Sequence, residues 1–229
     1  MPNILTIDWD YFFKASRKIR DSFPPIPDGT VGAIPDNSLW LKYYKSEYKE
    51  IGFDTTSFEQ LIKVICSSET KIRLSFSSEN HGEMINVTKY ICENLKDKAS
   101  TINITNVDYH HDFCFTGNTS RCDNWARLIQ FDSFDWCCRP DSNKQSFGLN
   151  ITDYFNVKEV AFSKVLTRLH LGYYQYVHLC RSDLYSPPKW DFLFDKLWIT
   201  LKENSLDTVN LGILSNRKAI CTQIINKEN

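Results

Sequence analysis

The chain has 229 residues, of which 42% are hydrophobic, and 27 basic residues nearly balance 28 acidic ones to leave a net charge of −1. A chain of this length and hydrophobicity can bury one substantial core, and no Pro-, Ser- or Gly-rich linker divides it, so we predict a single domain over residues 1–229. The balanced charge argues against nucleic acid and anionic membrane surfaces as partners, because both attract concentrated positive charge.

The sequence also argues against export and membrane insertion. The first apolar run, Ile4 to Ile7, is too short for a signal peptide and leads directly into Asp8 and Asp10. No other stretch is long and uncharged enough to span a bilayer. The eight cysteines are scattered and form no C-x-x-C pair, so we expect reduced thiols and a cytoplasmic protein.

Short apolar runs and helical spacing predict the elements in turn. Buried strands are expected at Ile4 to Trp9, Ile72 to Phe76, Ile102 to Val107 and Tyr176 to Cys180. Helices are expected from about Ser38 and around residues 58–65, 84–95, 124–129, 157–169 and 190–201. This alternation predicts an α/β protein, a three-layer sandwich with helices on both faces of a mainly parallel sheet.

Polar residues follow each predicted strand at the point where it ends. They are Asp8 and Asp10 after the first, Glu79 to His81 after the second, Asp108 to Asp112 after the third, and Arg181 to Asp183 after the fourth. The carboxyl ends of parallel strands share one edge of a sheet, and ligands bind there. We therefore expect these side chains to form the functional site.

The D-x-H-x-D motif of Asp108, His110 and Asp112 predicts half of a metal site. In extended backbone, alternate side chains leave the same face, so two carboxylates and an imidazole would converge. An isolated pair such as Asp8 and Asp10 is usually a capping or turn feature. Four carboxylates in one cleft would repel each other unless cations neutralise them, which favours two divalent metals.

Histidine completes the expected ligand set. A lone histidine is more often a satisfied core or surface residue, but His81 occupies the same place after its strand as the aspartates do. With His110, the set offers oxygen and nitrogen but no sulfur, which favours manganese over a structural zinc, with iron or cobalt as alternatives. Two such ions would generate hydroxide from a bridging water near neutral pH, so the pattern predicts hydrolysis.

These motifs resemble those of the arginase and agmatinase (ureohydrolase) superfamily, whose fold is a parallel-sheet α/β sandwich with two manganese ions. The resemblance implies two Mn²⁺ ions bridged by Asp108 and Asp8 and held by Asp8, Asp10, His81, Asp108, His110 and Asp112. The superfamily places its D-x-D after the D-x-H-x-D motif, whereas here it lies near the N-terminus. Either the chain is rearranged, or Asp8 and Asp10 are not ligands.

A small arginase-like group that includes peptide arginases is more similar still. Its I-D-x-D-Y/F-F, D-x-H-x-D and N-W segments resemble Ile7 to Phe12, Asp108 to Asp112 and Asn124-Trp125, and the similarity spans residue 4 to about 195. Peptide arginases convert arginine side chains of ribosomally made precursor peptides to ornithine and release urea. The implied partner is therefore an arginine-containing precursor peptide.

We expect roles in substrate binding or catalysis at four positions. Asp183 corresponds to an acidic residue that pairs with the substrate guanidinium, although a helix N-cap is an equal alternative. Asn124, in the N-W segment, is expected to bind substrate. Asp112 is expected to act as the acid that protonates the leaving amine. His111 would point away from His110 in extended backbone, so we expect it to orient a ligand or shuttle protons.

The sequence therefore predicts a manganese-dependent peptide arginase, a hydrolase acting on the C–N bonds of a linear amidine. A peptide is preferred because the loop from Phe113 to Asp123 lacks the polar pattern by which free-arginine enzymes hold the α-carboxylate and α-amine. Three alternatives stay open. They are a ureohydrolase acting on free arginine or a small guanidino compound, a one-metal zinc deacetylase that would leave His81 and Asp10 unused, and a non-catalytic peptide-binding protein with a metal-stabilised core.

Overall fold

The structure is a computed structural model that describes residues 1–21, 40, 51–94, 101–114, 118–142, 144, 154, 156–183, 185–212, 214 and 216–228. The helix expected from about Ser38 lies outside these residues apart from Trp40. None of the described helices is long and apolar enough to cross a membrane. All eight cysteines belong to the described part and carry free thiols, as expected.

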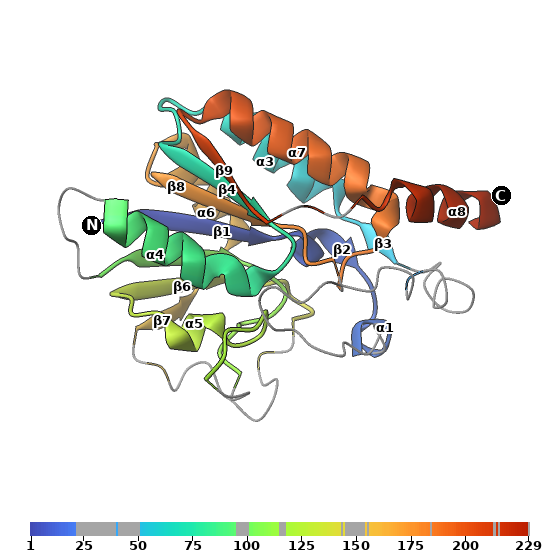
Figure 1. Cartoon of the computed structure of the whole chain (residues 1–229), viewed down its shortest axis with the longest axis horizontal. Helices are drawn as coiled ribbons and strands as arrows, with labels where there is room; N and C mark the ends of the chain where they lie inside the picture. Colours follow the sequence, from blue (N-terminus) through green and yellow to red (C-terminus); the bar gives the residue numbers. More distant parts are fainter. Residues whose placement is uncertain are drawn as a thin grey trace.

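A seven-stranded sheet runs through the middle of the molecule, and all its strands pair in parallel (Figure 1). Its spatial order is β7–β6–β5–β1–β8–β4–β9. The strands are β1 (Asn3–Asp8), β4 (Leu74–Ser78), β5 (Asn103–Val107), β6 (Ser133–Cys137), β7 (Val157–Glu159), β8 (Tyr176–Cys180) and β9 (Thr208–Leu211). The four strands predicted from apolar runs are confirmed, and they form the contiguous centre β5–β1–β8–β4.

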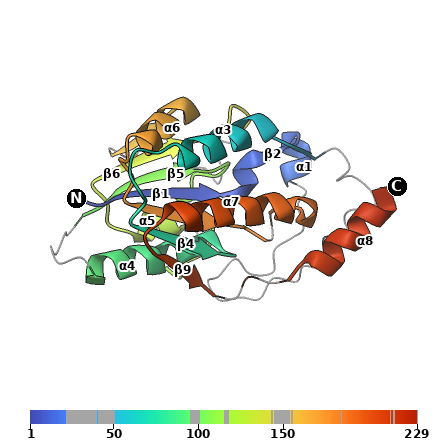
Figure 2. The ribbon, with the colours of Figure 1, turned by 90° about the horizontal axis from the view of Figure 1, so that it is seen from above.

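Helices cover both faces of the sheet, so the predicted three-layer α/β sandwich is confirmed (Figure 2). One face carries α3 (Thr55–Cys66), α6 (Phe162–His170) and α7 (Asp191–Asn204), and the other carries α4 (Met84–Asn94) and α5 (Trp125–Leu128). The remaining elements are η1 (Trp9–Phe12), β2 (Phe13–Lys14), α1 (Arg17–Asp21), β3 (Gly52–Phe53), η3 (His81–Glu83), η6 (Pro188–Trp190) and α8 (Lys218–Glu228). Strands β2 and β3 form a separate antiparallel pair.

The two faces of β1 show how the strand pattern divides the core. Leu5 and Ile7 belong to the apolar cluster under α3, α6 and α7, whereas Ile4 belongs to the cluster under α4 and α5. Thr6 and Asp8 alternate with Leu5 and Ile7, so they share the face of Ile4. The α4/α5 face of β1 is therefore apolar near the start of the strand and polar near its carboxyl end.

The structure differs from the sequence prediction at the sides of the sheet. Residues 157–169 were expected to form one helix, but Val157–Glu159 is the edge strand β7, and α6 begins only at Phe162. Pairing of β7 with β6 explains this, because backbone hydrogen bonds to a neighbouring strand outweigh the weak helical pattern of this segment. Strands β6 and β9 were not predicted, since polar residues interrupt both.

We expect the central strands to dominate stability. Leu179 on β8 is fully buried in the cluster under α3, α6 and α7, so Leu179→Ala should lower the free energy of unfolding by about 2–5 kcal/mol. The same kind of truncation at Ile199 on α7, which is 49% exposed, should change it by no more than about 0.5 kcal/mol. Urea unfolding followed by circular dichroism measures both, and equal losses would contradict this account of the core.

Candidate metal centre

The site lies where the central strands end, as the sequence predicts for a parallel sheet. Asp8 is the last residue of β1, and Asp108 directly follows β5, the neighbour of β1. His81 is the first residue of η3, in the turn after β4. Three segments far apart in the sequence thus bring their side chains to one edge of the sheet.

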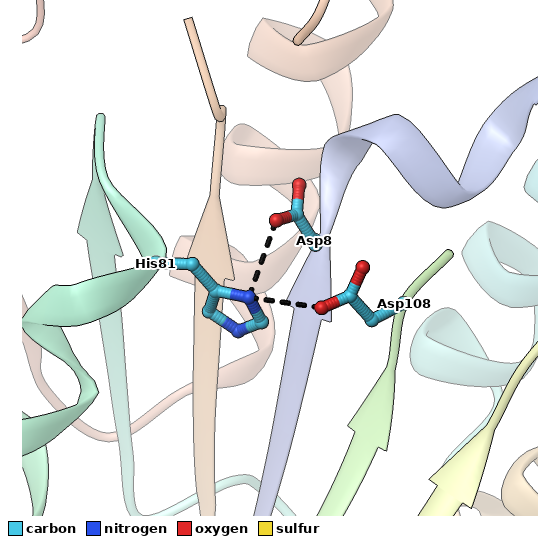
Figure 3. A group of neighbouring side chains, drawn as sticks. All are labelled: Asp8, His81 and Asp108. Carbon is cyan, nitrogen blue, oxygen red and sulfur yellow. Dashed lines mark ion pairs between the residues drawn. The ribbon is translucent and has the colours of Figure 1, made fainter. Parts of the chain in front are cut away.

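The first cluster surrounds the Nδ1 atom of His81. Figure 3 shows the ring of His81 with one nitrogen turned toward both Asp8 and Asp108. This nitrogen, Nδ1, lies 3.2 Å from Oδ2 of each carboxylate. The Oδ2 atom of Asp112 lies 3.0 Å from the same nitrogen. All four side chains are buried. One imidazole nitrogen and three carboxylates therefore face each other in a small volume.

A second cluster shares Asp108 with the first. His110 Nδ1 lies 3.2 Å from Asp10 Oδ2 and 3.9 Å from Asp108 Oδ1. Asp108 therefore turns one oxygen toward His81 and the other toward His110. Asp10 is fully buried, whereas the side chain of His110 is 35% exposed, so this cluster is the one that reaches solvent.

Turns rather than extended strands bring these residues together, which corrects the expected geometry of the D-x-H-x-D motif. Strand β5 ends at Val107, and Asp108 Oδ1 accepts a hydrogen bond of 2.8 Å from the backbone N–H of His110. Asp112 has a φ of +61°, a left-handed conformation that aspartate tolerates better than most residues. The three side chains converge because the chain bends, not because a strand alternates.

The pair Asp8 and Asp10 was expected to be either a capping feature or a pair of metal ligands, and the structure is compatible with both roles. Asp8 caps η1, because its Oδ1 accepts a hydrogen bond from the backbone N–H of Asp10 at 3.2 Å. Its Oδ2 faces His81 in the first cluster, while Asp10 belongs to the second. A capping role and a ligand role are therefore compatible in the same residue.

Three hydrogen-bond donors orient the carboxylates, and sequence reasoning did not identify them as part of the site. They are Ser182 Oγ to Asp8 Oδ2 (2.6 Å), Asn106 Nδ2 to Asp108 Oδ2 (3.2 Å) and Trp125 Nε1 to Asp112 Oδ2 (2.5 Å). Such donors to metal-binding carboxylates fix their orientation. The only signal in the sequence was nearness to the motifs: Asn106 and Ser182 adjoin the polar residues at two strand ends, and Trp125 belongs to the N-W segment.

Burial and mutual repulsion perturb the carboxylates. Burial, followed by the charges of Asp10 and Asp108, raises the pKa of Asp8 to about 6. Burial and the charge of Asp112 raise the pKa of Asp108 to about 7. Burial would also raise the pKa of Asp10, but the charge of His110 close to its carboxylate lowers it overall. Protons and cations therefore compete for this cluster near neutral pH.

The pKa values of the two imidazoles are raised as well. Burial alone would lower the pKa of His81, but the charge of Asp112 and close contacts with the Asp108 and Asp8 carboxylates raise it well above the ordinary value. Burial would also lower the pKa of His110, but the nearby charge of Asp10 outweighs this effect and raises the pKa to about 9. Both histidines thus lie in a strongly negative environment that favours positive charge.

The donor set fits a divalent cation. Among the described residues, His81 Nδ1 and both carboxylate oxygens of Asp10 are buried without a partner in hydrogen-bonding geometry. The candidate ligand atoms in each of two sets lie within 4.8 Å of one another. These sets are Asp8, His81 and Asp108, and Asp10, Asp108 and His110. Each set thus contains buried atoms without a hydrogen-bond partner close to other candidate ligand atoms, which is the arrangement expected of metal ligands.

The nearby guanidinium of Arg20 does not replace a metal. Its Nη1 lies 3.9 Å from Asp10 Oδ2, but its amino groups donate to the backbone carbonyls of Asp10 and Phe13, and its plane lies 3.7 Å from the centre of the Tyr109 ring. One such charge at the margin cannot offset four buried carboxylates. The cluster retains an excess of negative charge.

The structure places Asp183 in an internal ion pair. Asp183 is buried, and its two carboxylate oxygens accept hydrogen bonds from Arg181. Its backbone carbonyl accepts from Arg217, which is itself buried and paired with Asp191. A substrate guanidinium would have to displace Arg181 to reach this carboxylate. The expected contact with substrate therefore stays a prediction that the geometry does not favour.

Two other expected site residues also have internal roles. The buried ring of His111 lies against Trp136 and Phe113, and its Nδ1 accepts a hydrogen bond of 3.0 Å from the backbone N–H of Phe113. Asn124 accepts from the backbone N–H of Arg121 and donates to the carbonyl of Thr119. Proton transfer by His111 and substrate binding by Asn124 stay predictions. What the structure shows for Asn124 is a brace for the turn before Trp125.

We expect the metal-free protein to lose stability as the pH rises from about 5 to 9. The raised pKa values of Asp8 and Asp108, about 6 and 7, mean that deprotonation costs folding free energy through this range. Folding raises the pKa of His110 to about 9, so protonated His110 stabilises the folded state. This stabilisation is fully present when the pH is below the ordinary pKa of histidine, and it is lost as the pH rises through the pKa of the folded state. Asp10, with a lowered pKa, contributes equally throughout this interval.

Urea unfolding in chelator at a series of pH values measures this slope. Added Mn²⁺ should oppose the fall, because a cation that binds only the folded state stabilises it. A stability that rises between pH 5 and 9 in chelator would contradict the assigned environment of the cluster.

Removing one of the repelling charges should stabilise the metal-free protein. Asp108→Asn keeps the shape and the acceptor for the His110 N–H, so at pH 8 in chelator we expect a gain of about 0.5–2 kcal/mol. The same variant should gain less from Mn²⁺ than the natural chain. Asp132→Asn, the same substitution at an exposed position, is the matched control and should change neither value. Loss of stability in Asp108→Asn under chelator would contradict the charge argument.

Comparison with known proteins offers no relative through which to interpret the site. No family model, no curated protein and no solved structure matches this chain. The geometry of the cluster is therefore the basis for its proposed function.

Proposed function

We propose that the protein is a binuclear manganese hydrolase that cleaves the guanidinium group of arginine side chains in a peptide, leaving ornithine and releasing urea. The observation that carries this proposal is the position of Asp108, whose two oxygens face two different clusters. A carboxylate shared in this way is suited to bridge two ions. The resemblance of the motifs to arginase-like enzymes supports the same chemistry.

The ligand types favour two ions of manganese. One set offers Asp8, His81 and Asp112 beside the bridging Asp108, and the other offers Asp10 and His110. Carboxylate oxygens with a minority of imidazole nitrogens suit manganese better than a structural zinc. A one-metal deacetylase would leave either His81 or Asp10 unused, although both are buried and face other candidate ligands.

Two bound divalent ions would supply positive charge that lowers the pKa of a water molecule enough to make it a nucleophile near neutral pH. The protein's own residues hold and orient the reacting groups. Asp112, which Trp125 holds beside His81, is the group that we assign to proton transfer to the leaving amine. His110, partly exposed, marks the side from which a guanidinium can approach.

A peptide rather than free arginine is the proposed substrate. The loop from Phe113 to Asp123 lacks a polar pattern for the α-carboxylate and α-amine of a free amino acid, although residues 115–117 lie outside the described part. The ring of Tyr185 lies 5.5 Å from that of His110 and gives the open side of the site an aromatic wall. An aromatic wall suits the apolar stem of an arginine side chain.

The experiment is an assay of purified protein with Mn²⁺ and a panel of arginine peptides, lysine peptides, free arginine and agmatine. We expect the arginine peptides to release urea and to lose CH₂N₂ per arginine. Lysine peptides should release no urea, because an ammonium group offers no electrophilic carbon. Free arginine and agmatine should release none if the substrate is a peptide. Asp108→Asn should lower the rate by about 10–100-fold or more, since it removes the shared ligand, whereas Asp132→Asn should not.

Each contrary result has a defined meaning. Urea from free arginine or agmatine but not from peptides would show that the proposed peptide substrate is wrong, whereas the proposed hydrolysis of a guanidinium group would stand. Manganese binding without urea from any substrate would favour a metal-stabilised binding protein. Full activity after exhaustive chelation would refute the metal-dependent mechanism.

A further inference from the structure

A chain of buried hydrogen bonds begins at His81, at the ring nitrogen that faces away from the carboxylates. His81 Nε2 lies 2.7 Å from Thr6 Oγ1, which lies 3.0 Å from His178 Nδ1. His178 Nε2 lies 2.8 Å from Ser78 Oγ, which donates to the carbonyl of Asn80 at 3.0 Å. Thr6, Ser78, His81 and His178 are fully buried. The chain ends at the peptide group that precedes His81 itself.

The carbonyl at the end of this chain fixes its direction. A carbonyl can only accept, so the one hydroxyl hydrogen of Ser78 goes to Asn80, and Ser78 Oγ accepts from His178 Nε2–H. His178 is fully buried and its two ring nitrogens face the uncharged hydroxyls of Thr6 and Ser78, so the ring is neutral and carries one N–H. Its Nδ1 must then accept from the hydroxyl of Thr6.

The same logic reaches His81. Because the hydrogen of the Thr6 hydroxyl goes to His178, Thr6 Oγ1 accepts from His81 Nε2–H. The other ring nitrogen, Nδ1, is the atom that faces Asp8, Asp108 and Asp112. With Nε2 committed as a donor, a neutral His81 has its lone pair on the atom that faces the cluster.

We propose that Thr6, His178 and Ser78 are positioning residues that hold His81 in its Nε2–H tautomer and direct its Nδ1 lone pair toward a bound divalent cation. This inference rests on the proposed metal centre and deepens it. A metal-binding histidine commonly donates its second N–H to an acceptor that fixes the tautomer and the ring orientation. Here the acceptor is a threonine whose own hydrogen is directed by a second histidine.

The sheet builds this arrangement from neighbouring strands. Thr6 on β1 and His178 on β8 are paired in register, and Ser78 is the last residue of β4, on the other side of β8. Polar side chains in the buried centre of a sheet cost free energy relative to apolar ones unless every donor and acceptor is matched. In this relay each hydrogen has one acceptor, so the network can be retained at small cost.

Thr6→Val is the main test, because it replaces the hydroxyl with a methyl group of similar size and leaves His81 Nε2–H without its acceptor. Isothermal titration of the full chain with Mn²⁺ should show affinity about 10–100-fold weaker than in the natural chain. Thr6→Ser keeps the hydroxyl and should bind within a few-fold of the natural affinity. Urea unfolding in chelator should show that both variants fold.

A second variant covers the case in which Thr6→Val fails to fold. Ser78→Ala, a small truncation at the far end of the relay, removes the acceptor for His178 Nε2–H and should also weaken Mn²⁺ binding, by less than Thr6→Val. Nitrogen-15 spectra of the metal-free natural chain should place the single proton of His178 on Nε2. A proton on Nδ1 of His178 would overturn the direction of the relay.

The outcomes separate this inference from the proposed hydrolysis. If Thr6→Val and Ser78→Ala fold and bind Mn²⁺ as tightly as the natural chain, the relay only holds strands together and the inference is wrong, whatever the activity. If the natural chain binds Mn²⁺ and the variants bind it weakly, the inference holds even if no urea is released. If the natural chain binds no Mn²⁺, both proposals fail.

Discussion

Negative charge held in a buried pocket is the constraint on which the rest of the site depends. Four aspartates converge at one edge of the sheet, and burial with mutual repulsion raises the pKa of Asp8 to about 6 and that of Asp108 to about 7. Such a cluster costs folding free energy unless protons or cations offset it. The neighbouring imidazoles and one guanidinium offset only part of it, which is why a divalent cation is the partner best matched to this pocket.

The parallel sheet makes this charged pocket tolerable. On the α4/α5 face, the start of the central strands contributes apolar side chains such as Ile4 and Tyr176 to a closed core. Further along the same strands, Thr6, Ser78 and His178 make hydrogen bonds that are all internal. Stability and chemistry are thus divided along the length of the same strands. On the opposite face, β1 and β8 contribute Leu5, Ile7, Val177 and Leu179 to one apolar cluster.

Short apolar runs predicted the central strands, and the motifs after them predicted which polar side chains cluster, because both patterns are local. The side strands were missed since β6 and β9 carry polar residues at alternate positions. His178 was not predicted as part of the site because it lies within an apolar run. A polar residue in a buried central strand nevertheless indicates a hydrogen-bond partner inside the protein. The turn at Asp112 is held by a hydrogen bond from Trp125, which sequence spacing does not encode. The pairing of Asp183 with Arg181 is local, because the two residues are two positions apart, and it was missed because the carboxylate was assigned to the substrate.

The central claim is that Asp108 joins two cation sites, and the number of ions bound tests it most directly. Equilibrium dialysis against Mn²⁺ with metal analysis, combined with electron paramagnetic resonance, counts the ions and detects magnetic coupling between them. The account predicts two Mn²⁺ per chain with the spectrum of a coupled pair, and loss of that coupling in Asp108→Asn. A single uncoupled ion in the natural chain, or a coupled pair that survives Asp108→Asn, would contradict it.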